Sequence, residues 1–381
     1  MKLRLNLAAA GLAAAFFTSA ALADVKVGVL VSATGPAAAI GLPMKNAVPL
    51  LPKELAGQKI EYIVLDDGGD PTKSVTNARK LITEDNVDVL VGSSITPTSI
   101  PLVDIAGEVK IPLLATVPTM AMVQPMDEKR RWVFKMPQND SLMAEAIAAH
   151  MEKAGVKTVA YIGYNDGYGE GWFAEVDRIF PMHGIKILVK ETFARADTSV
   201  TGQVLKLMAA NADVVFIAAS GTPAVLPQKT LRERGFTKQV YQTHGISTMD
   251  FIRVGGKDVE GTIFPAGPMT VAAQLDDSNP IKKSAVEFTK AYEEMYKIPM
   301  AAFAGHMVDT SRMIEAALPA ALAKAKPGTP EFRAALRDAL ENTKEVVLTH
   351  GIMNMTPTNH CGFDERARVM LKIENGQWKI I

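Results

Sequence analysis

The sequence predicts an α/β protein with two Rossmann-like lobes, each built on a parallel sheet. Short apolar runs alternate with helix-like stretches along the chain, and this alternation is typical of right-handed βαβ crossovers. It starts anew after Asn139-Asp140, which indicates a second lobe. The chain has 381 residues, of which 48% are hydrophobic. That length favours two domains, and that composition suits strands buried on both faces.

The first lobe is predicted to contain five apolar strands, with helices between them. A turn at Gly35-Pro36 precedes the first helix, and Asp70-Pro71 begins the second. Thr96 is the expected N-cap of the third helix, because Pro97 would occupy the first helical position, where a missing N–H costs nothing. The expected strands are 25–31, 60–66, 87–92, 111–115 and 132–136. The expected helices end near residues 50, 84 and 109.

The second lobe is predicted to repeat this alternation of strands and helices, with different residues. A turn over 165–171 opens one helix, and Thr222-Pro223 opens another. The expected strands are 158–164, 185–192, 212–218 and 239–242. The expected helices are 143–154, 172–183, 200–210 and a segment that ends at 234. Later helices over 284–296, 304–323 and 330–342 are expected to add to one lobe, and a β-hairpin is expected around Asn375-Gly376.

Residues 1–23 are predicted to be a signal peptide. A short basic region precedes an apolar run from Leu5 to Ala21, and Ala21-Leu22-Ala23 is a small-residue cleavage site before Asp24. A membrane anchor is the competing interpretation, but the apolar run is short and the cleavage site follows it directly. We therefore expect export to the periplasm.

Charge and motif content argue against several function classes. Lys and Arg number 41, as do Asp and Glu, so neither nucleic acid nor a membrane surface is an expected partner. The single cysteine, Cys361, cannot form an intramolecular disulfide. The six histidines lack metal-ligand spacing, and there is no nucleophile elbow or phosphate-binding glycine loop. The sequence therefore predicts no enzyme, no metal and no cofactor.

Hydroxyl-bearing residues are common in the loops that follow the predicted strands. These loops are 94–98, 117–119, 165–169, 220–223 and 243–247. In open α/β sheets ligands bind outside the carboxyl ends of strands. The helix that begins at Thr96 would also present free N–H groups there. A lone Thr-Pro could simply start a helix, but the recurrence of such loops predicts a cleft for a small anion held by hydrogen bonds.

Six segments, in this order along the chain, are similar to those of a known family. They are Val27-Gly28-Val29 with Ser32-Ala33-Thr34-Gly35-Pro36, Leu65-Asp66-Asp67-Gly68-Gly69-Asp70-Pro71, Val91-Gly92-Ser93-Ser94, Tyr168-Gly169-Glu170-Gly171, Leu231-Arg232-Glu233-Arg234-Gly235 and Val259-Glu260-Gly261. With them the chain resembles the type I periplasmic substrate-binding proteins of ABC importers, in the branched-chain amino acid (Leu/Ile/Val) group.

The resemblance implies an architecture and a set of partners. Two lobes would be joined by a three-strand hinge, with lobe 1 formed by 24–140 plus 266–357 and lobe 2 by 141–265 plus 358–381. The protein would be a monomer that captures a small carboxylate between the lobes and docks onto the membrane subunits of an ABC permease. A ligand-binding sensor module for a signalling receptor is the alternative, because the same fold serves both purposes.

The family's carboxylate-binding positions fall on four residues of this chain. Thr96 matches the serine that grips the ligand carboxylate. Val117 and Thr119 match the backbone and hydroxyl contacts of the next loop. Tyr168 matches the aromatic lid from the second lobe, and the glycines around it predict an exposed ring, although Tyr168 could instead be a packing residue.

Three other positions depart from the amino acid binders. His244 stands where those proteins carry an acidic residue for the ligand ammonium, and Ser220 and Ile40 each stand where they carry a tyrosine. A buried ammonium without a carboxylate partner is very costly, so α-amino acids should be disfavoured. The two smaller side chains leave room for a flat ring.

These departures resemble the subset of the family that binds aromatic carboxylates and 2-oxo acids such as benzoylformate. His244 would then donate to a carbonyl or hydroxyl oxygen. Two alternatives stay open. His244 could merely shape its loop, and the protein could bind branched-chain or other amino acids.

Overall fold

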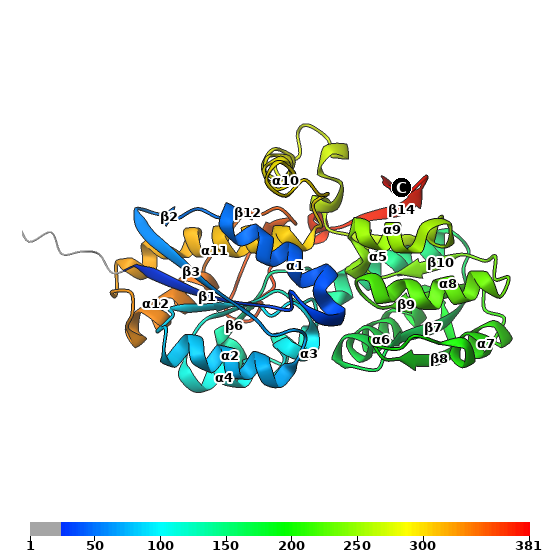
Figure 1. The fold of residues 1–381 in the computed structure, drawn as a ribbon, viewed down its shortest axis with the longest axis horizontal. Helices are drawn as coiled ribbons and strands as arrows, with labels where there is room; N and C mark the ends of the chain where they lie inside the picture. The colour runs from blue at the N-terminus through cyan, green and yellow to red at the C-terminus, as the bar shows by residue number, and fades with distance from the viewer. Residues whose placement is uncertain (1–23) are drawn as a thin grey trace, which may run out of the picture.

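The computed structural model describes residues 24–381, which form two α/β lobes lying side by side (Figure 1). The predicted signal peptide, 1–23, lies outside the described residues. Within 24–381, the structure has no helix that combines the length and the apolar character needed to cross a membrane. The predicted fold class, two lobes each with a largely parallel sheet, is confirmed.

Lobe 1 is built on a six-stranded sheet in the order β2-β3-β1-β4-β5-β6. All neighbours in it are parallel except β2 and β3. The strands are β1 (Val25–Val31), β2 (Glu54–Leu55), β3 (Gln58–Asp66), β4 (Val89–Val91), β5 (Leu113–Ala115) and β6 (Val133–Lys135). The side chains of β1 alternate between the two faces, because Val27 and Val29 pack in one apolar cluster and Leu30 in another.

Helices cover both faces of this sheet, α2 and α4 on one face and α1, α11 and α12 on the other (Figure 1). They are α1 (Ala38–Ala47), α2 (Pro71–Thr83), α3 (Thr96–Ser99), α4 (Leu102–Val109), α11 (Phe303–Leu322) and α12 (Pro330–Glu341). The helix α10 (Lys282–Tyr296) also buries residues in the lobe 1 cluster and stands out at the top of Figure 1. A small two-stranded sheet, β12 (Val346–Val347) and β13 (Ile352–Met353), completes the lobe.

Lobe 2 has a seven-stranded sheet in the order β15-β14-β11-β10-β9-β7-β8. The strands are β7 (Thr158–Tyr164), β8 (Lys186–Phe193), β9 (Val214–Ala218), β10 (Val240–Gln242), β11 (Ile263–Ala266), β14 (Val369–Glu374) and β15 (Gln377–Ile380). The predicted C-terminal hairpin is β14–β15, which pairs antiparallel with β11. The helices are α5 (Asp140–Lys153), α6 (Gly167–Ile179), α7 (Thr201–Ala209), α8 (Val225–Glu233) and α9 (Met249–Gly255).

Two details of the third helix in lobe 1 differ from the prediction. The expected continuous helix is divided into α3 and α4, and Pro101 lies at the division. Proline removes a backbone donor and clashes with the preceding turn, which explains the break. The N-cap of α3 is Ile95, so Thr96 is the first helical residue and not the cap. Its hydroxyl is therefore not used to close the helix end.

The chain passes between the lobes after β6, after β11 and before β14, and one side chain ties these segments together. The Gln138 amide Nε2 donates to the Ala367 carbonyl at 2.7 Å and to the His350 carbonyl at 3.2 Å. A Cβ added to Gly267 would lie 2.7 Å from the same nitrogen, so all three segments meet at Gln138. This arrangement agrees with a three-strand hinge.

The exact lobe boundaries remain predictions. The His360 carbonyl accepts from Lys135 N at 2.7 Å, and the His360 ring Nδ1 lies 2.8 Å from the Val133 carbonyl. Both partners belong to β6 of lobe 1. These contacts favour a third crossing after His360, later in the chain than the expected boundary at 357/358.

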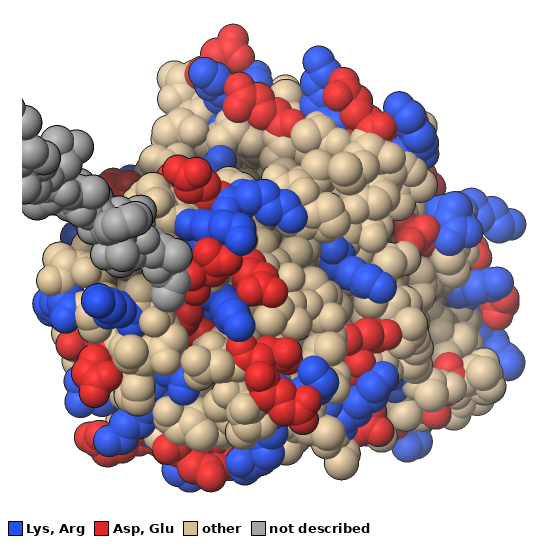
Figure 2. Space-filling view, turned by 60° about the vertical axis from the view of Figure 1, so that its left-hand side comes forward, with Lys and Arg blue, Asp and Glu red and all other residues tan. Residues whose placement is uncertain are grey.

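Charged side chains of both signs are interspersed over the face of the molecule shown in Figure 2. Most of the ion pairs that they form are exposed at one or both partners, and such pairs contribute little stability. The core and the buried hydrogen bonds therefore contribute more to stability than these pairs do.

Replacing Gln138 by alanine should lower the free energy of unfolding by about 1–3 kcal/mol, because two buried carbonyls would lose their donor. Urea unfolding followed by circular dichroism measures this loss. Gln124→Ala is the matched control, since the Gln124 amide makes one exposed contact, with the Thr358 carbonyl at 3.4 Å. Equal midpoints for the two variants would show that Gln138 does not hold the crossings together.

Candidate ligand-binding site

A small cavity, of about 30 Å³, lies between the lobes, at the carboxyl ends of strands from both sheets. Lobe 1 contributes Ile40 and the loops after β4 and β5, and lobe 2 contributes the loops after β7, β8, β9 and β10. Phe303 and His306, on the first turn of α11, line it as well.

The lobe 1 loops are held rigidly by hydroxyl hydrogen bonds. Ser94 Oγ accepts from Ser32 N at 2.9 Å, and Thr116 Oγ1 donates to the Ser93 carbonyl at 2.7 Å. Thr96 is an exception, because its hydroxyl is buried and has no partner. A buried polar atom without a partner is costly, so a hydrogen-bonding ligand at this place would relieve that cost.

Val117 and Thr119, the two residues predicted to contact the ligand from the loop after β5, differ in position. Val117 lines the cavity, whereas Thr119 is not among the lining residues. Thr119 Oγ1 accepts from Ala121 N at 3.4 Å and caps a short 3₁₀ helix, Met120–Met122. A Cβ on Gly171 of α6 would lie 3.2 Å from the same hydroxyl. Thr119 thus lies where the lobes meet, and its contact with a ligand remains a prediction.

Tyr168 lines the cavity but is not the exposed ring that the neighbouring glycines predicted. It is 4% exposed, and its hydroxyl lies 2.8 Å from Thr243 Oγ1. The glycines serve close packing instead. A Cβ on Gly169 would lie 1.9 Å from the Tyr164 carbonyl, and one on Gly167 would lie 3.2 Å from the Thr96 methyl group. Glycine at these positions lets α6 approach β7 on one side and lobe 1 on the other.

Arg195 is the cavity residue that sequence reasoning missed. Its Nε donates to Asp166 Oδ2 at 2.6 Å and its Nη1 to Ser220 Oγ at 3.0 Å. Its guanidinium carbon lies 4.0 Å from the centre of the Tyr164 ring, and Nη2 is buried without a partner. Arg195 follows β8 by two residues, so the same strand-end criterion could have found it. A fixed guanidinium with a free N–H is well suited to a carboxylate.

His244 and His306 bring two neutral imidazoles to the cavity. Burial, with smaller contributions from Lys135 and His350, lowers the pKa of His244 to about 3. Burial also lowers the pKa of His306 well below its ordinary value. Both side chains are therefore uncharged near neutral pH, and Nδ1 of each is buried without a partner.

The cavity lining contains a positively charged residue and no negatively charged one. No lining residue is an aspartate or a glutamate, whereas Arg195 supplies a cation. Asp166, which pairs with that cation, is not among the lining residues, and its Oδ1 accepts from Tyr168 N at 2.8 Å. The arrangement can stabilise an anion and offers no carboxylate to an ammonium group.

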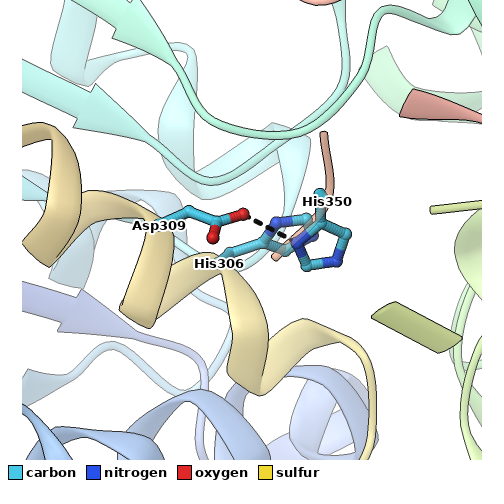
Figure 3. Close-up of side chains that lie close together, drawn as sticks. All are labelled: His306, Asp309 and His350. Carbon is cyan, nitrogen blue, oxygen red and sulfur yellow. Dashed lines mark hydrogen bonds and ion pairs between the residues drawn. The ribbon is translucent and has the colours of Figure 1, made fainter. Parts of the chain in front are cut away.

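His306, which lines the cavity, lies close to Asp309 and His350 (Figure 3). One potential metal-ligand atom from each lies within 4.8 Å of the others. However, the two imidazole rings are stacked, with centroids 4.1 Å apart and planes 20° apart. A metal ion must lie in the plane of each ring that binds it, and two stacked, nearly parallel planes do not meet at such an ion. The geometry favours a hydrogen-bonded stack over a metal centre.

Comparisons with known proteins agree with this architecture. A family model described as periplasmic binding protein matches residues 24–370. The chain is 27% identical to the Leu/Ile/Val-binding protein homolog 3 of Brucella melitensis, over 94% of each chain. It is 49% identical to the solved extracellular ligand-binding receptor from Rhodopseudomonas palustris HaA2, with a TM-score of 0.91 over 94% of this chain and 100% of that one.

A further solved relative shares the fold at lower identity. It is the solute-binding protein of an ABC transporter from R. palustris in complex with benzoate, 20% identical, with a TM-score of 0.79 over 94% of this chain and 96% of that one. Two parallel-sheet lobes, a cavity between their strand ends and a family match over nearly all described residues lead to one conclusion. The chain belongs to the periplasmic binding protein family.

Proposed function

We propose that this protein is a non-enzymatic solute-binding receptor of an ABC transporter, which captures an aromatic or 2-oxo carboxylic acid between its lobes. The observation that carries the proposal is the charge of the cavity lining, which includes Arg195 with one unpartnered guanidinium nitrogen and contains no carboxylate. Such a site attracts a carboxylate and penalises a ligand that also carries an ammonium group.

The carboxylate of the ligand would lie against Thr96 and Arg195. Each has one unpartnered polar atom, the Thr96 hydroxyl and Arg195 Nη2. Val117 lines the cavity nearby, and we propose that its loop adds backbone contacts, as the family resemblance implies. Hydrogen bonds with a charged partner are stronger than those between neutral groups. The carboxylate should therefore contribute most of the binding affinity.

The rest of the lining suits an apolar ring better than an aliphatic amino acid. Ile40, Ile95, Pro118 and the Tyr168 ring supply apolar surface. Ser220 is small, and its hydroxyl already accepts from Arg195. A benzoate-bound relative of the same fold makes benzoate a suitable probe, whereas the name of the Brucella relative keeps amino acids as the alternative.

We also propose that the protein acts in the periplasm as a monomer that delivers its ligand to a membrane permease. A sensor module would share the cavity but would report to a signalling receptor. Uptake of labelled benzoylformate that depends on this protein would support transport. A transcriptional response without any uptake would support the sensor.

The protein should bind phenylpyruvate and benzoylformate and reject phenylalanine and leucine. Phenylpyruvate and phenylalanine differ only at the α-position, so size does not separate them. Phenylalanine and leucine should bind weakly because their buried ammonium group would be unpaired. Neutral His244 cannot replace the acidic residue that amino acid binders carry at this position. Isothermal titration calorimetry on the four ligands tests this. Phenylalanine binding as tight as that of phenylpyruvate would place the protein with the amino acid binders.

Thr96→Val should weaken the binding of phenylpyruvate by about 1.5–3 kcal/mol, the contribution of one hydrogen bond to a charged group. Arg195→Met should weaken it by at least as much, since it removes the cation while keeping most of the side-chain volume. Both dissociation constants are measured by calorimetry at a single pH.

Arg178→Met is the matched control for the arginine variant. Arg178 lies on α6, is exposed and pairs with Glu175. Thermal unfolding of each variant separates lost binding from lost folding. A dissociation constant that stays unchanged in both Thr96→Val and Arg195→Met would show that the carboxylate binds elsewhere.

A further inference from the structure

One buried carboxylate joins the loops that form the lobe 1 side of the cavity. Asp67 directly follows β3, is fully buried and is not among the residues that line the cavity. Its Oδ1 accepts from Ser32 Oγ at 2.6 Å and from Gly69 N at 2.9 Å, and its Oδ2 accepts from Ser93 Oγ at 2.5 Å. Ser32 follows β1 and Ser93 follows β4, so this side chain bridges the ends of three neighbouring strands.

The hydrogen-bond network continues from Ser93 to residues that line the cavity. Ser93 Oγ accepts from Ser94 N at 2.6 Å, and the Ser93 carbonyl accepts from Thr116 Oγ1 at 2.7 Å. Ser94 Oγ accepts in turn from Ser32 N at 2.9 Å. Ser94 and Thr116 both line the cavity, so a displacement of Ser93 would move two lining residues.

Thr96 lies in a segment that is attached to Ser93 at both ends. Ser99 Oγ donates to the Ser93 carbonyl at 3.1 Å and to the Ile95 carbonyl at 3.0 Å. Thr96 is the first residue of α3 and Ser99 the last, so the chain from Ser93 to Ser99 closes on itself where Asp67 holds it. Thr96 is thus held by its neighbours and not by its own hydroxyl, which is buried without a partner.

The donors around position 67 match a carboxylate and no other side chain of this size. Two hydroxyls and one backbone N–H converge there, and a carboxylate accepts from all three. Asparagine has a single acceptor oxygen, and its NH₂ group would face one of these donors. At least one of the three loops would then lose its present contact.

We propose that Asp67 is a positioning residue, which raises the affinity for the ligand by holding Ser94, Thr96 and Thr116 in place without touching the ligand. A site that is already ordered binds more tightly, because less conformational freedom is lost on binding. This inference rests on the proposed function, because it takes Thr96 as a contact of the ligand carboxylate. The alternative is that the network only joins the strand ends and stabilises lobe 1.

Asp67→Asn should raise the dissociation constant of phenylpyruvate roughly 10-fold, as measured by calorimetry, because the three loops would no longer be fixed together. Asp88→Asn is the matched control. Asp88 is also fully buried, and its carboxylate accepts from Lys26 N at 3.0 Å and from Gly328 N at 2.6 Å. It precedes β4, at the opposite edge of the same sheet. The control should lose stability and keep the dissociation constant of the wild type.

A double-mutant cycle between positions 67 and 96 is the deciding readout, because a purely structural role of Asp67 would not couple it to Thr96. Asp67→Asn already disturbs the position of Thr96. Thr96→Val should therefore weaken binding less in the Asp67→Asn background than in the wild type, by roughly 2-fold or more. If Asp67→Asn does not fold, as judged by thermal unfolding, Ser93→Ala takes its place. It removes the hydroxyl that joins Asp67 to this loop, and the same weakening and coupling are expected.

The outcomes separate this inference from the proposed function. An unchanged dissociation constant in a folded Asp67 variant, or effects that simply multiply in the double variant, would overturn the inference and leave the proposed function intact. Wild-type protein that binds phenylalanine in place of phenylpyruvate would overturn the proposed function. The cycle is then measured with phenylalanine, which carries the same carboxylate, and coupling to Thr96 would still support the positioning role.

Discussion

The parallel direction of the strands places the loops that follow them at one edge of each sheet, and the two edges face each other across the cavity. Most of the site depends on this constraint. The loops after β4 and β5 supply hydroxyl and backbone groups from lobe 1, and the loops after β8 and β10 supply Arg195 and His244 from lobe 2. Residues far apart in the chain thereby line a single small cavity.

Close packing determines how near the two edges come. Gly167 and Gly171 on α6 face Thr96 and Thr119 of lobe 1, with Cβ-to-neighbour distances that would be 3.2 Å in each case. Between them, Gly169 lies against the β7 backbone. Side chains at these positions would push α6 away from both neighbours. The approach buries the Tyr168 ring and, with it, encloses the ligand site.

Electrostatics and unsatisfied polar atoms then set the chemistry of the enclosed site. Asp166 pairs with Arg195 from outside the lining, so the largely buried guanidinium has a counterion and no carboxylate lines the cavity. The two histidines are neutral because burial opposes their protonation. Four residues that each have an unpartnered buried polar atom line the same cavity, namely Thr96, Arg195, His244 and His306.

The sequence by itself determined the fold class, most strand positions and six of the cavity residues, namely Ile40, Thr96, Val117, Tyr168, Ser220 and His244. It could do so because strand periodicity and strand-end loops are local patterns, and the family resemblance supplied the correspondence of positions. The tertiary structure decided the rest. His306 reaches the cavity on α11, which follows β11 by almost 40 residues and packs on the other lobe, so no local pattern marks it. The burial of Tyr168, the free nitrogen of Arg195 and the meeting of three crossings at Gln138 depend on contacts between residues 25 or more positions apart, and only the folded chain brings those residues together.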